Sequence, residues 1–268
     1  MSRLPAVYRR QMALALQEHL QYRVGLAFWI LGMAVEPVVQ LVVWGAVATA
    51  RGGEVAGYSA GAFAAYYILW VVVRTMNIAL TPWAFEQRVR QGGLSPLLLR
   101  PVHPFHVDLA DFTAMKVVSL VILLPILLVL SLLFRPDFHA LTPLRLAGFL
   151  VAIWTGFVMR FIWVWALGLV TFWVLRVSAL FDLYFALELI LSGRLVPIDL
   201  LPAGVRELAL SLPWYYAYGF PIELALGRAD AAAVLRGFAL QLAWGLVGTG
   251  LLALLWRRGV KRYTAVGG

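Results

Sequence analysis

Residues 117–134 read Val-Val-Ser-Leu-Val-Ile-Leu-Leu-Pro-Ile-Leu-Leu-Val-Leu-Ser-Leu-Leu-Phe and contain no charged side chain. A helix of this length crosses most of the hydrocarbon core of a bilayer, which is about 30 Å thick. A membrane β-barrel would instead show apolar and polar residues in alternation. The stretch therefore predicts a membrane-spanning helix and indicates an all-α fold.

The composition of the whole chain agrees with this assignment. Of the 268 residues, 63% are hydrophobic and only 13% are charged, whereas soluble domains are about 25% charged. The net charge of +9 could suggest nucleic-acid binding, but the basic residues stand mainly at the ends of apolar runs, where they orient membrane helices. We therefore expect a bilayer around the protein and no nucleic acid as a partner. Because the chain has no cysteine, disulfides and thiolate sites are excluded.

Six apolar runs predict a polytopic protein with six spans in a single transmembrane domain, residues 1–268. The expected spans are 24–49, 63–80, 117–134, 146–175, 177–196 and 237–256, with Arg176 ending the fourth run. Pro37 predicts a kink in the first span, and Pro125 interrupts the third. Residues 1–22 are expected to form an amphipathic interfacial helix on the membrane. A solvated tail is the alternative for them.

Residues 82–116, which we call the handle, separate the second and third spans. The sequence from Glu86 to Pro104 is charged, punctuated by glycine and proline, and too polar to cross a bilayer. We therefore expect a loop that presents a surface to another protein.

Residues 197–232 are apolar but are divided by Pro197, Pro202, Pro213 and Pro221 into pieces too short to span. Such pieces predict re-entrant helices, at 203–212 and 214–227. The aromatic side chains of this region are expected to anchor the protein at the membrane interface, with an external gate as the alternative. They are Trp214, Tyr215, Tyr216, Tyr218 and Phe220.

The distribution of basic residues predicts the orientation. The N-terminal segment, the handle, Arg176 and the C-terminal tail share one side and carry Arg3, Arg9, Arg10, Arg23, Arg88, Arg90, Arg100, Lys116, Arg176, Arg257, Arg258, Lys261 and Arg262. The opposite loops carry Arg51, Arg135, Arg145, Arg206, Arg228 and Arg236. By the positive-inside rule, both termini and the handle are cytoplasmic and residues 197–232 are extracytoplasmic.

Polar side chains within the predicted spans are candidates for function. They are Glu36, Arg74, Asn77, Arg160, Asp182 and Glu188. Since a charge at the centre of a membrane helix costs about 2.5–3.5 kcal/mol on insertion scales, pairing is expected. Matching depths suggests pairs of Arg74 with Asp182 and of Arg160 with Glu188. A structural role is favoured over a proton or ion relay because acids and bases occur together.

Signals for catalysis are weak. His103 and His106 lie near Asp108 and Asp111, but the remaining histidines are far away in the sequence, and we expect no metal site. The chain has neither a phosphate-binding Gly-rich motif nor a Gly-x-Ser-x-Gly elbow. The chain is therefore not expected to be an enzyme or to hydrolyse ATP.

Two segments resemble a known family. The six-span topology and the pattern Ser192-Gly193-x-x-x-Pro197, continued by Pro202 and by Leu212-Pro213, resemble permease subunits of type-2 ABC exporters. In the handle, Glu86, Gly92, Leu94 and the run Leu97-Leu98-Leu99-Arg100-Pro101-Val102 are similar to a subgroup of small six-span permeases. Members of that subgroup are often encoded as two related subunits beside one ATPase.

The resemblance implies a half-transporter that pairs with a second permease, either a related chain or an identical copy. Two cytoplasmic ATPase subunits, which bind ATP and Mg, would dock on the N-terminal helix and residues 82–112; this chain would bind no cofactor. The resemblance implies a coupling role for Arg10, Glu86, Arg88, Arg90, Gly92, Leu94, Arg100 and Pro101. It implies an outer re-entrant or gate role for Gly193, Pro197, Pro202, Pro213, Trp214, Tyr215 and Tyr216.

The expected substrates are lipophilic or toxic small molecules, and the expected location is a bacterial inner membrane. A secondary carrier driven by an ion gradient is the main alternative. It would predict inverted repeats with a broken helix in each half, which the sequence does not show. An intramembrane enzyme would need a Ser/His or paired-Asp arrangement at one depth, which is also missing.

Overall fold

The computed structural model describes residues 4–79, 82–174 and 177–263. The helices are α1 (Leu4–Gln21), α2 (Arg23–Ala50), α3 (Ala60–Met76), α4 (Pro82–Arg90), α5 (Ser95–Leu98), α6 (Pro104–Phe134), α7 (Pro143–Gly168), α8 (Ser178–Leu191), α9 (Ala203–Ser211), α10 (Pro213–Ala217), α11 (Gly219–Ala225) and α12 (Ala231–Gly259). Short 3-10 helices follow as η1 (Leu169–Phe172), η2 (Ile198–Leu200) and η3 (Val260–Arg262). A small antiparallel hairpin, β1 (Glu54–Val55) with β2 (Tyr58–Ser59), joins α2 to α3. The predicted all-α class is confirmed.

Each of the six predicted spans coincides with a helix, but their lengths differ. Within the described residues, four helices are long and apolar enough to cross a membrane: Arg23–Ala50, Pro104–Phe134, Pro143–Phe172 and Ala231–Arg262. α3 has 17 residues and α8 has 14, which correspond to roughly 26 and 21 Å. Both are shorter than the hydrocarbon core of about 30 Å.

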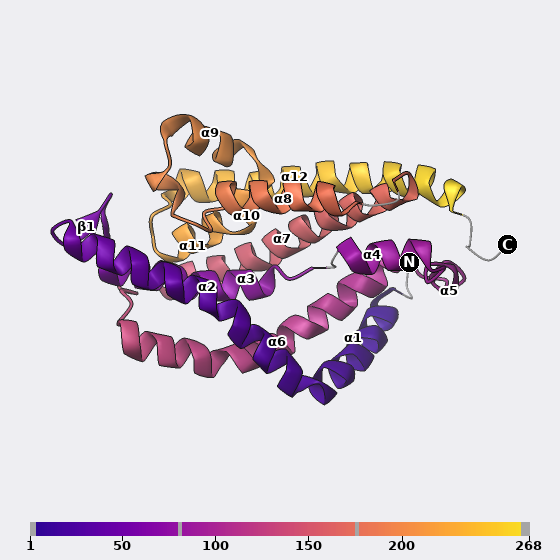
Figure 1. Cartoon of the computed structure of the whole chain (residues 1–268), viewed down its shortest axis with the longest axis horizontal. Helices are drawn as coiled ribbons and strands as arrows, with labels where there is room; N and C mark the ends of the chain where they lie inside the picture. Colours follow the sequence, from indigo (N-terminus) through magenta and orange to yellow (C-terminus); the bar gives the residue numbers. More distant parts are fainter. Residues whose placement is uncertain (1–3, 80–81, 175–176, 264–268) are drawn as a thin grey trace.

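The centre of the bundle is formed by α3 and α7 (Figure 1). Nearly all side chains of α3 from Phe63 to Met76 are buried, as expected for a helix that is apolar on every side. α2, α6 and α11 pack around α3, and α12 runs along α7. The outer helices keep rows of exposed apolar side chains, such as Leu124, Leu128 and Leu132 on α6. These rows are suited to contact with lipid.

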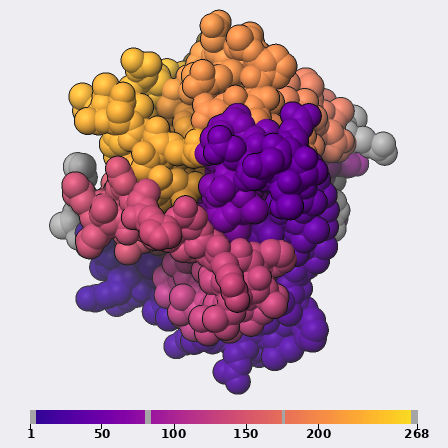
Figure 2. Space-filling view, turned by 90° about the vertical axis from the view of Figure 1, so that its left-hand side faces the viewer, coloured from indigo at the N-terminus to yellow at the C-terminus, as the bar shows by residue number. Residues whose placement is uncertain are grey.

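The molecule has two distinct ends (Figure 1). One, which we call the handle end, holds α4, α5, the first turns of α1 and the last turns of α12. Contacts confirm this arrangement: the Tyr8 hydroxyl lies 2.8 Å from His106 Nδ1, and the hydroxyls of Ser95 and Tyr263 are 2.9 Å apart. At the other end, the hairpin, the end of α6 and the segment around α9 to α11 gather on one face (Figure 2).

The handle differs from the predicted loop because most of it is helical. α6 begins at Pro104, where the His103 side chain accepts the backbone N–H of Phe105 as an N-terminal cap. In the first turns of α6, three charged side chains that interrupt the apolar pattern have partners on other elements. Asp108 binds Arg88, Asp111 lies 3.6 Å from His19, and the Lys116 ammonium donates to Ile78 O at 2.6 Å.

The prolines of the predicted spans lie inside continuous helices. α2 continues through Pro37 and α6 through Pro125, so neither residue ends its helix. The predicted helix 203–212 is confirmed as α9. The predicted helix 214–227 is instead two helices, α10 and α11, which are separated at Tyr218, where the backbone leaves the helical region (φ −128°, ψ −69°). Arg176 lies outside the described residues, as does Arg3.

Candidate functional site

The carboxylate of Glu36 on α2 joins three parts of the chain. Arg74 of α3 donates Nη1 to Oε2 at 2.8 Å. Arg194, in the segment after α8, donates Nε to Oε1 at 2.6 Å and Nη2 to Oε2 at 2.5 Å. The predicted pairing of Arg74 with Asp182 is therefore wrong, and Asp182 is exposed on α8. Depth along a span does not show which helices are neighbours, and α3 packs against α2.

The proline after Glu36 explains a second contact of Arg74. Pro37 has no backbone N–H, so the carbonyl of Met33, four residues earlier, lacks its usual helical donor. Arg74 Nη1 fills this vacancy with a hydrogen bond of 2.9 Å to Met33 O. One guanidinium thus binds both the carboxylate and the free carbonyl of α2.

Arg160 of α7 forms a second network with Glu188 of α8. Its Nε and Nη2 donate to the two carboxylate oxygens of Glu188 at 2.7 and 2.9 Å, which confirms the predicted pair. Nη1 donates to Asn77 O at the end of α3, at 2.6 Å. The Tyr218 hydroxyl donates to Glu188 Oε1 at 2.9 Å. Bidentate charged bonds of this kind fix the positions of both side chains.

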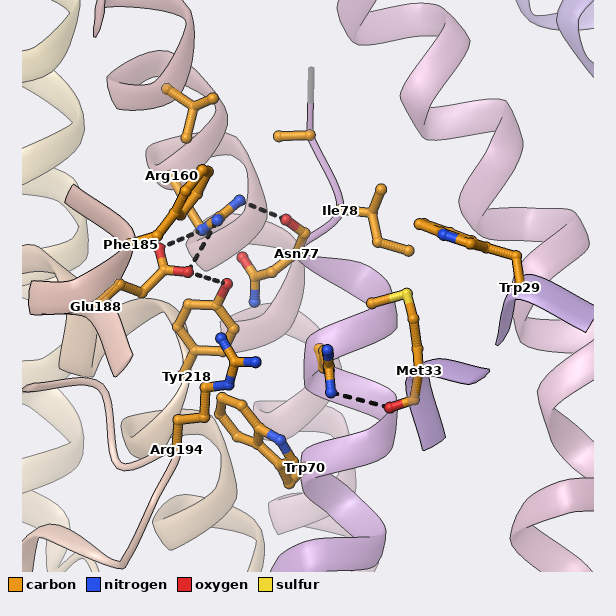
Figure 3. A pocket seen from close by; sticks show the side chains of 13 residues that line it. Trp29, Met33, Trp70, Asn77, Ile78, Arg160, Phe185, Glu188, Arg194 and Tyr218 are labelled. Atoms are coloured by element: carbon orange, nitrogen blue, oxygen red, sulfur yellow. Dashed lines mark hydrogen bonds and ion pairs between the residues drawn. The ribbon is translucent and has the colours of Figure 1, made fainter. Parts of the chain in front are cut away.

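A cavity of about 250 Å³ lies between the two networks. Figure 3 shows its walls: Arg160, Glu188 and Phe185 on one side, Trp29 and Met33 on the other, and Trp70 and Tyr218 between them. The rings of Trp70 and Tyr218 are tilted at 33° with centroids 5.0 Å apart. The cavity therefore combines aromatic walls with fixed charges inside the bundle.

Asn77 stands at the C-terminal end of α3, on the wall of the cavity. Its amide Nδ2 donates to Val73 O at 3.0 Å and to Ala217 O at 2.8 Å. These two carbonyl partners fix the amide orientation, because a flipped amide would face them with its oxygen. Asn77 Oδ1 is buried and has no hydrogen-bond partner within the described part of the chain.

The structure brings together most of the polar residues selected from the sequence. Arg74, Asn77, Arg160 and Glu188 line the cavity, and Glu36 holds Arg74 and Arg194 from behind; only Asp182 lies elsewhere. The sequence selection missed Trp70, Phe185 and Arg194, and it named Tyr218 only as an interface anchor or part of an external gate. An arginine in an apolar stretch could have singled out Arg194, but Trp70 and Phe185 carry no signal that separates them from core residues.

Comparison with known families decides what kind of protein carries this cavity. The model of the family described as ABC-2 family transporter protein matches residues 34–267. The chain belongs to the ABC-2 transporter family. A comparison with curated proteins gives no match. The matched range includes Glu36, the handle and every lining residue of the cavity from Trp70 onward. As an ABC-2 permease, the protein is a multi-pass membrane transport protein.

The handle of this ABC-2 permease is attached to the bundle by two of its predicted coupling residues. Glu86 Oε1 accepts the backbone N–H of Val177, just before α8, at 2.6 Å. Arg88 Nη1 donates to Asp108 Oδ2 at 2.6 Å, and the same oxygen accepts Trp165 Nε1 at 2.9 Å. These bonds connect α4 to α6, α7 and the start of α8.

The other predicted coupling residues are either turn-forming or exposed. Leu94 is buried, and Gly92 has φ +74°, a left-handed conformation that glycine adopts without strain. Arg10, Arg90, Arg100 and Pro101 are exposed. Burial lowers the pKa of His103 in the handle. Its Nδ1 accepts a backbone N–H, as a neutral imidazole can.

The segment from Gly193 to α10 contains the residues predicted to form a gate. Gly193 has φ +86°, and a Cβ at this position would lie 2.6 Å from the Tyr66 hydroxyl. That hydroxyl donates to Gly193 O at 2.9 Å, so the segment after α8 is held against α3. Pro197 and Pro202 directly precede η2 and α9, and Pro213 is the first residue of α10.

Two aromatic residues of α10, Tyr215 and Tyr216, do not lie on the surface as interface anchors would. Tyr215 and Tyr216 are buried, with 5% and 3% of their areas exposed. Tyr216 donates to Leu210 O at 2.6 Å, and Trp214 packs edge-on against Tyr184 of α8. Tyr215 donates to Glu223 Oε2 at 2.6 Å. Burial raises the pKa of Glu223 to about 7.

Proposed function

We propose that this ABC-2 permease is one of two permease subunits of an ATP-driven exporter. The two permeases pair in the membrane, and two ATPase subunits bind at the handle end. The observation that carries the proposal is the bond from Val177 N–H to Glu86 Oε1. It connects the handle to α8, whose Glu188 lines the cavity. Movement imposed on α4 is therefore transmitted to a wall of the cavity.

A second connection runs through the segment between α3 and α4. Ile78 and Ala79 line the cavity and directly follow α3. The Lys116 ammonium of α6 holds Ile78 by its carbonyl and lies 4.2 Å from the centre of the Phe157 ring. A shift of α6 relative to α3 would thus change the shape of the cavity from this side as well.

The exposed basic residues of the handle end form the contact surface for the ATPases in this proposal. Arg10 of α1, Arg90 of α4 and Arg100 make no ion pair within the described residues. Charged rim residues of this type guide and orient a partner. The ATPases bind ATP and Mg and hydrolyse the nucleotide, and this chain supplies the path.

The proposed orientation places the handle end in the cytoplasm of a bacterial cell, with the protein in the inner membrane. It follows from the positive-inside rule, since Arg88, Arg90, Arg257 and Arg258 lie at the handle end. In this orientation α3 and α8, extended by the chain around Asn77 and Ser192, complete six spans. The α9, α10 and α11 helices then form the extracytoplasmic re-entrant region.

The aromatic and apolar walls of the cavity support export of lipophilic or toxic small molecules. We place the substrate path at the cavity because it lies between α2, α3, α7 and α8 and is reached by both connections from the handle. Closure of the ATPases on ATP would rearrange α8 and the residues after α3 around the substrate.

Copurification tests this proposal. The permease is isolated under mild conditions from the cells that produce it naturally, and the bound proteins are identified by mass spectrometry. An ATPase subunit at a stoichiometry of one per permease is the expected result, and identification of the second permease distinguishes a homodimer from a heterodimer. Isolation of the permease alone, together with transport driven by an ion gradient in liposomes, would show a secondary carrier and contradict the proposal.

A further inference from the structure

The charges around the central cavity do not balance. Three guanidinium groups, those of Arg74, Arg160 and Arg194, line it. Two carboxylates oppose them, Glu188 on the wall and Glu36 directly behind. One positive charge therefore remains without a counter-charge inside the bundle. The side chains of Arg74 and Arg194 are 20% and 25% exposed, so this charge is only partly shielded from water, and an anion in the cavity would neutralise it.

Two of the arginines that line the cavity have unused hydrogen-bond donors. A guanidinium has five N–H bonds. Arg160 uses all three of its nitrogens. Within the described part of the chain, Arg74 forms hydrogen bonds only through Nη1, and Arg194 only through Nε and Nη2. Arg74 Nε and Nη2 and Arg194 Nη1 remain available to an oxyanion.

Asn77, another residue of the cavity wall, carries a buried acceptor without a partner among the described residues. Asn77 is 2% exposed, and its Oδ1 lacks a hydrogen bond among the described residues, whereas its Nδ2 is held by two carbonyls. A buried acceptor without a partner is unfavourable. A ligand with an N–H or O–H next to its anionic group would satisfy Asn77 Oδ1 while its oxyanion binds arginine.

The remaining walls define the body of the ligand. Trp29, Trp70, Phe185 and Tyr218 present aromatic surface. The volume of about 250 Å³ is below the range of about 300–1,000 Å³ of ordinary ligand pockets. The cavity thus fits a compact molecule with a ring or short apolar body.

We propose that the cavity selects compact organic anions that carry an N–H or O–H donor beside the anionic group and an aromatic or apolar body. This inference rests on the proposed export function, because it assigns the substrate class of that path. A lipophilic cation is disfavoured, since it would add to the unbalanced positive charge and would leave the free guanidinium donors without acceptors.

N-Benzoylglycine is a suitable probe because it combines a carboxylate, an amide N–H and a phenyl ring. Its binding to the full chain in lipid nanodiscs is measured by titration calorimetry and by quenching of tryptophan fluorescence, with empty nanodiscs as the reference for partitioning into lipid. Three analogues isolate each feature: the methyl ester lacks the charge, N-benzoyl-N-methylglycine lacks the donor, and N-benzoylethylenediamine is a cation.

Saturable binding of N-benzoylglycine is expected, with the ester and the cation at least about tenfold weaker because charge-assisted bonds are lost. The N-methyl analogue should be weaker than the parent acid. Arg74→Gln should weaken the acid about tenfold, whereas the exposed control Arg206→Gln on α9 should not. Because the analogues are compared on the unaltered protein, the test does not depend on the folding of any variant.

Equal binding of the ester or the cation, or no saturable binding of the acid, would overturn the proposed ligand class. These outcomes are separable from failure of the export function. Copurification of an ATPase with a permease that binds no anion would support the export function and refute the ligand class. Anion binding by a permease that has no ATPase partner would support the ligand class and refute the ATP-driven export function.

Discussion

Arg160 of α7 and Glu188 of α8 face each other in a bidentate pair, with Nε–Oε2 at 2.7 Å and Nη2–Oε1 at 2.9 Å. Their side chains are 8% and 4% exposed. α8 has 14 residues and is shorter than the hydrocarbon core, so its length alone does not fix its position across the bilayer. The pair therefore fixes the position of α8 against the centre of the bundle and beside the cavity.

Removal of the Glu188 carboxylate should destabilise the protein strongly. Glu188→Ala leaves the Arg160 guanidinium buried without its counter-charge, which costs about 3–5 kcal/mol. The measurement is the midpoint of thermal unfolding in detergent. Asp182→Ala is the matched control, because Asp182 lies on the same helix but is exposed. Equal melting of Glu188→Ala and the wild type would contradict a structural role for the pair.

Gly193→Ala should lower the free energy of unfolding by more than backbone strain alone would. Gly193 and Gly52 have similar φ values, +86° and +88°, but only Gly193 has a neighbour, the Tyr66 hydroxyl, where a Cβ would lie. Strained conformations of this kind cost of order 1–3 kcal/mol. Thermal melting of Gly193→Ala and Gly52→Ala separates the clash from the strain. If the clash is real, Tyr66→Phe should partly restore the melting midpoint of Gly193→Ala.

Substitutions in the handle should divide into two groups. Glu86→Ala removes the bond to Val177 and should uncouple ATP hydrolysis from transport while the ATPase still binds. Arg90→Glu with Arg100→Glu changes exposed residues and should reduce copurification of the ATPase without lowering the melting midpoint. ATPase activity and transport are measured in proteoliposomes. Normal transport by all of these variants would show that the handle has no role in coupling.

Stability should depend on pH through Glu223. Its pKa rises from an ordinary value of 4.5 to about 7 in the folded protein because the side chain is buried. Between these values the folded state keeps a proton that the unfolded chain has released, so the free energy of unfolding falls as the pH rises.

Glu223→Gln should therefore flatten the decrease of the melting midpoint between pH 5 and 8, and the variant should exceed the wild type at the upper end. Glu207→Gln, at an exposed position on α9, serves as the control. A pH profile of Glu223→Gln identical to that of the wild type would refute this assignment.

Several parts of the fold could be predicted because they follow from local sequence. The six apolar runs located α2, α3, α6, α7, α8 and α12, since continuous apolar sequence has a stable place only in a helix within the bilayer. The handle was located but was assigned as a loop. Its charges resembled those of a solvated segment, and only the tertiary structure shows that Asp108 and Lys116 have partners on α4 and at the end of α3.

The sequence by itself determined the class of protein, the positions of its helices and most of the charged residues that matter, because hydropathy and charge are properties of each residue. Only the tertiary structure decided which charges meet. Arg74 pairs with Glu36, which also binds Arg194, and not with Asp182 as predicted. The reason is that side-chain packing around α3 decides which helices are neighbours. The cavity, its excess positive charge and the Asn77 carbonyl that has no partner among the described residues arise only where those helices come together.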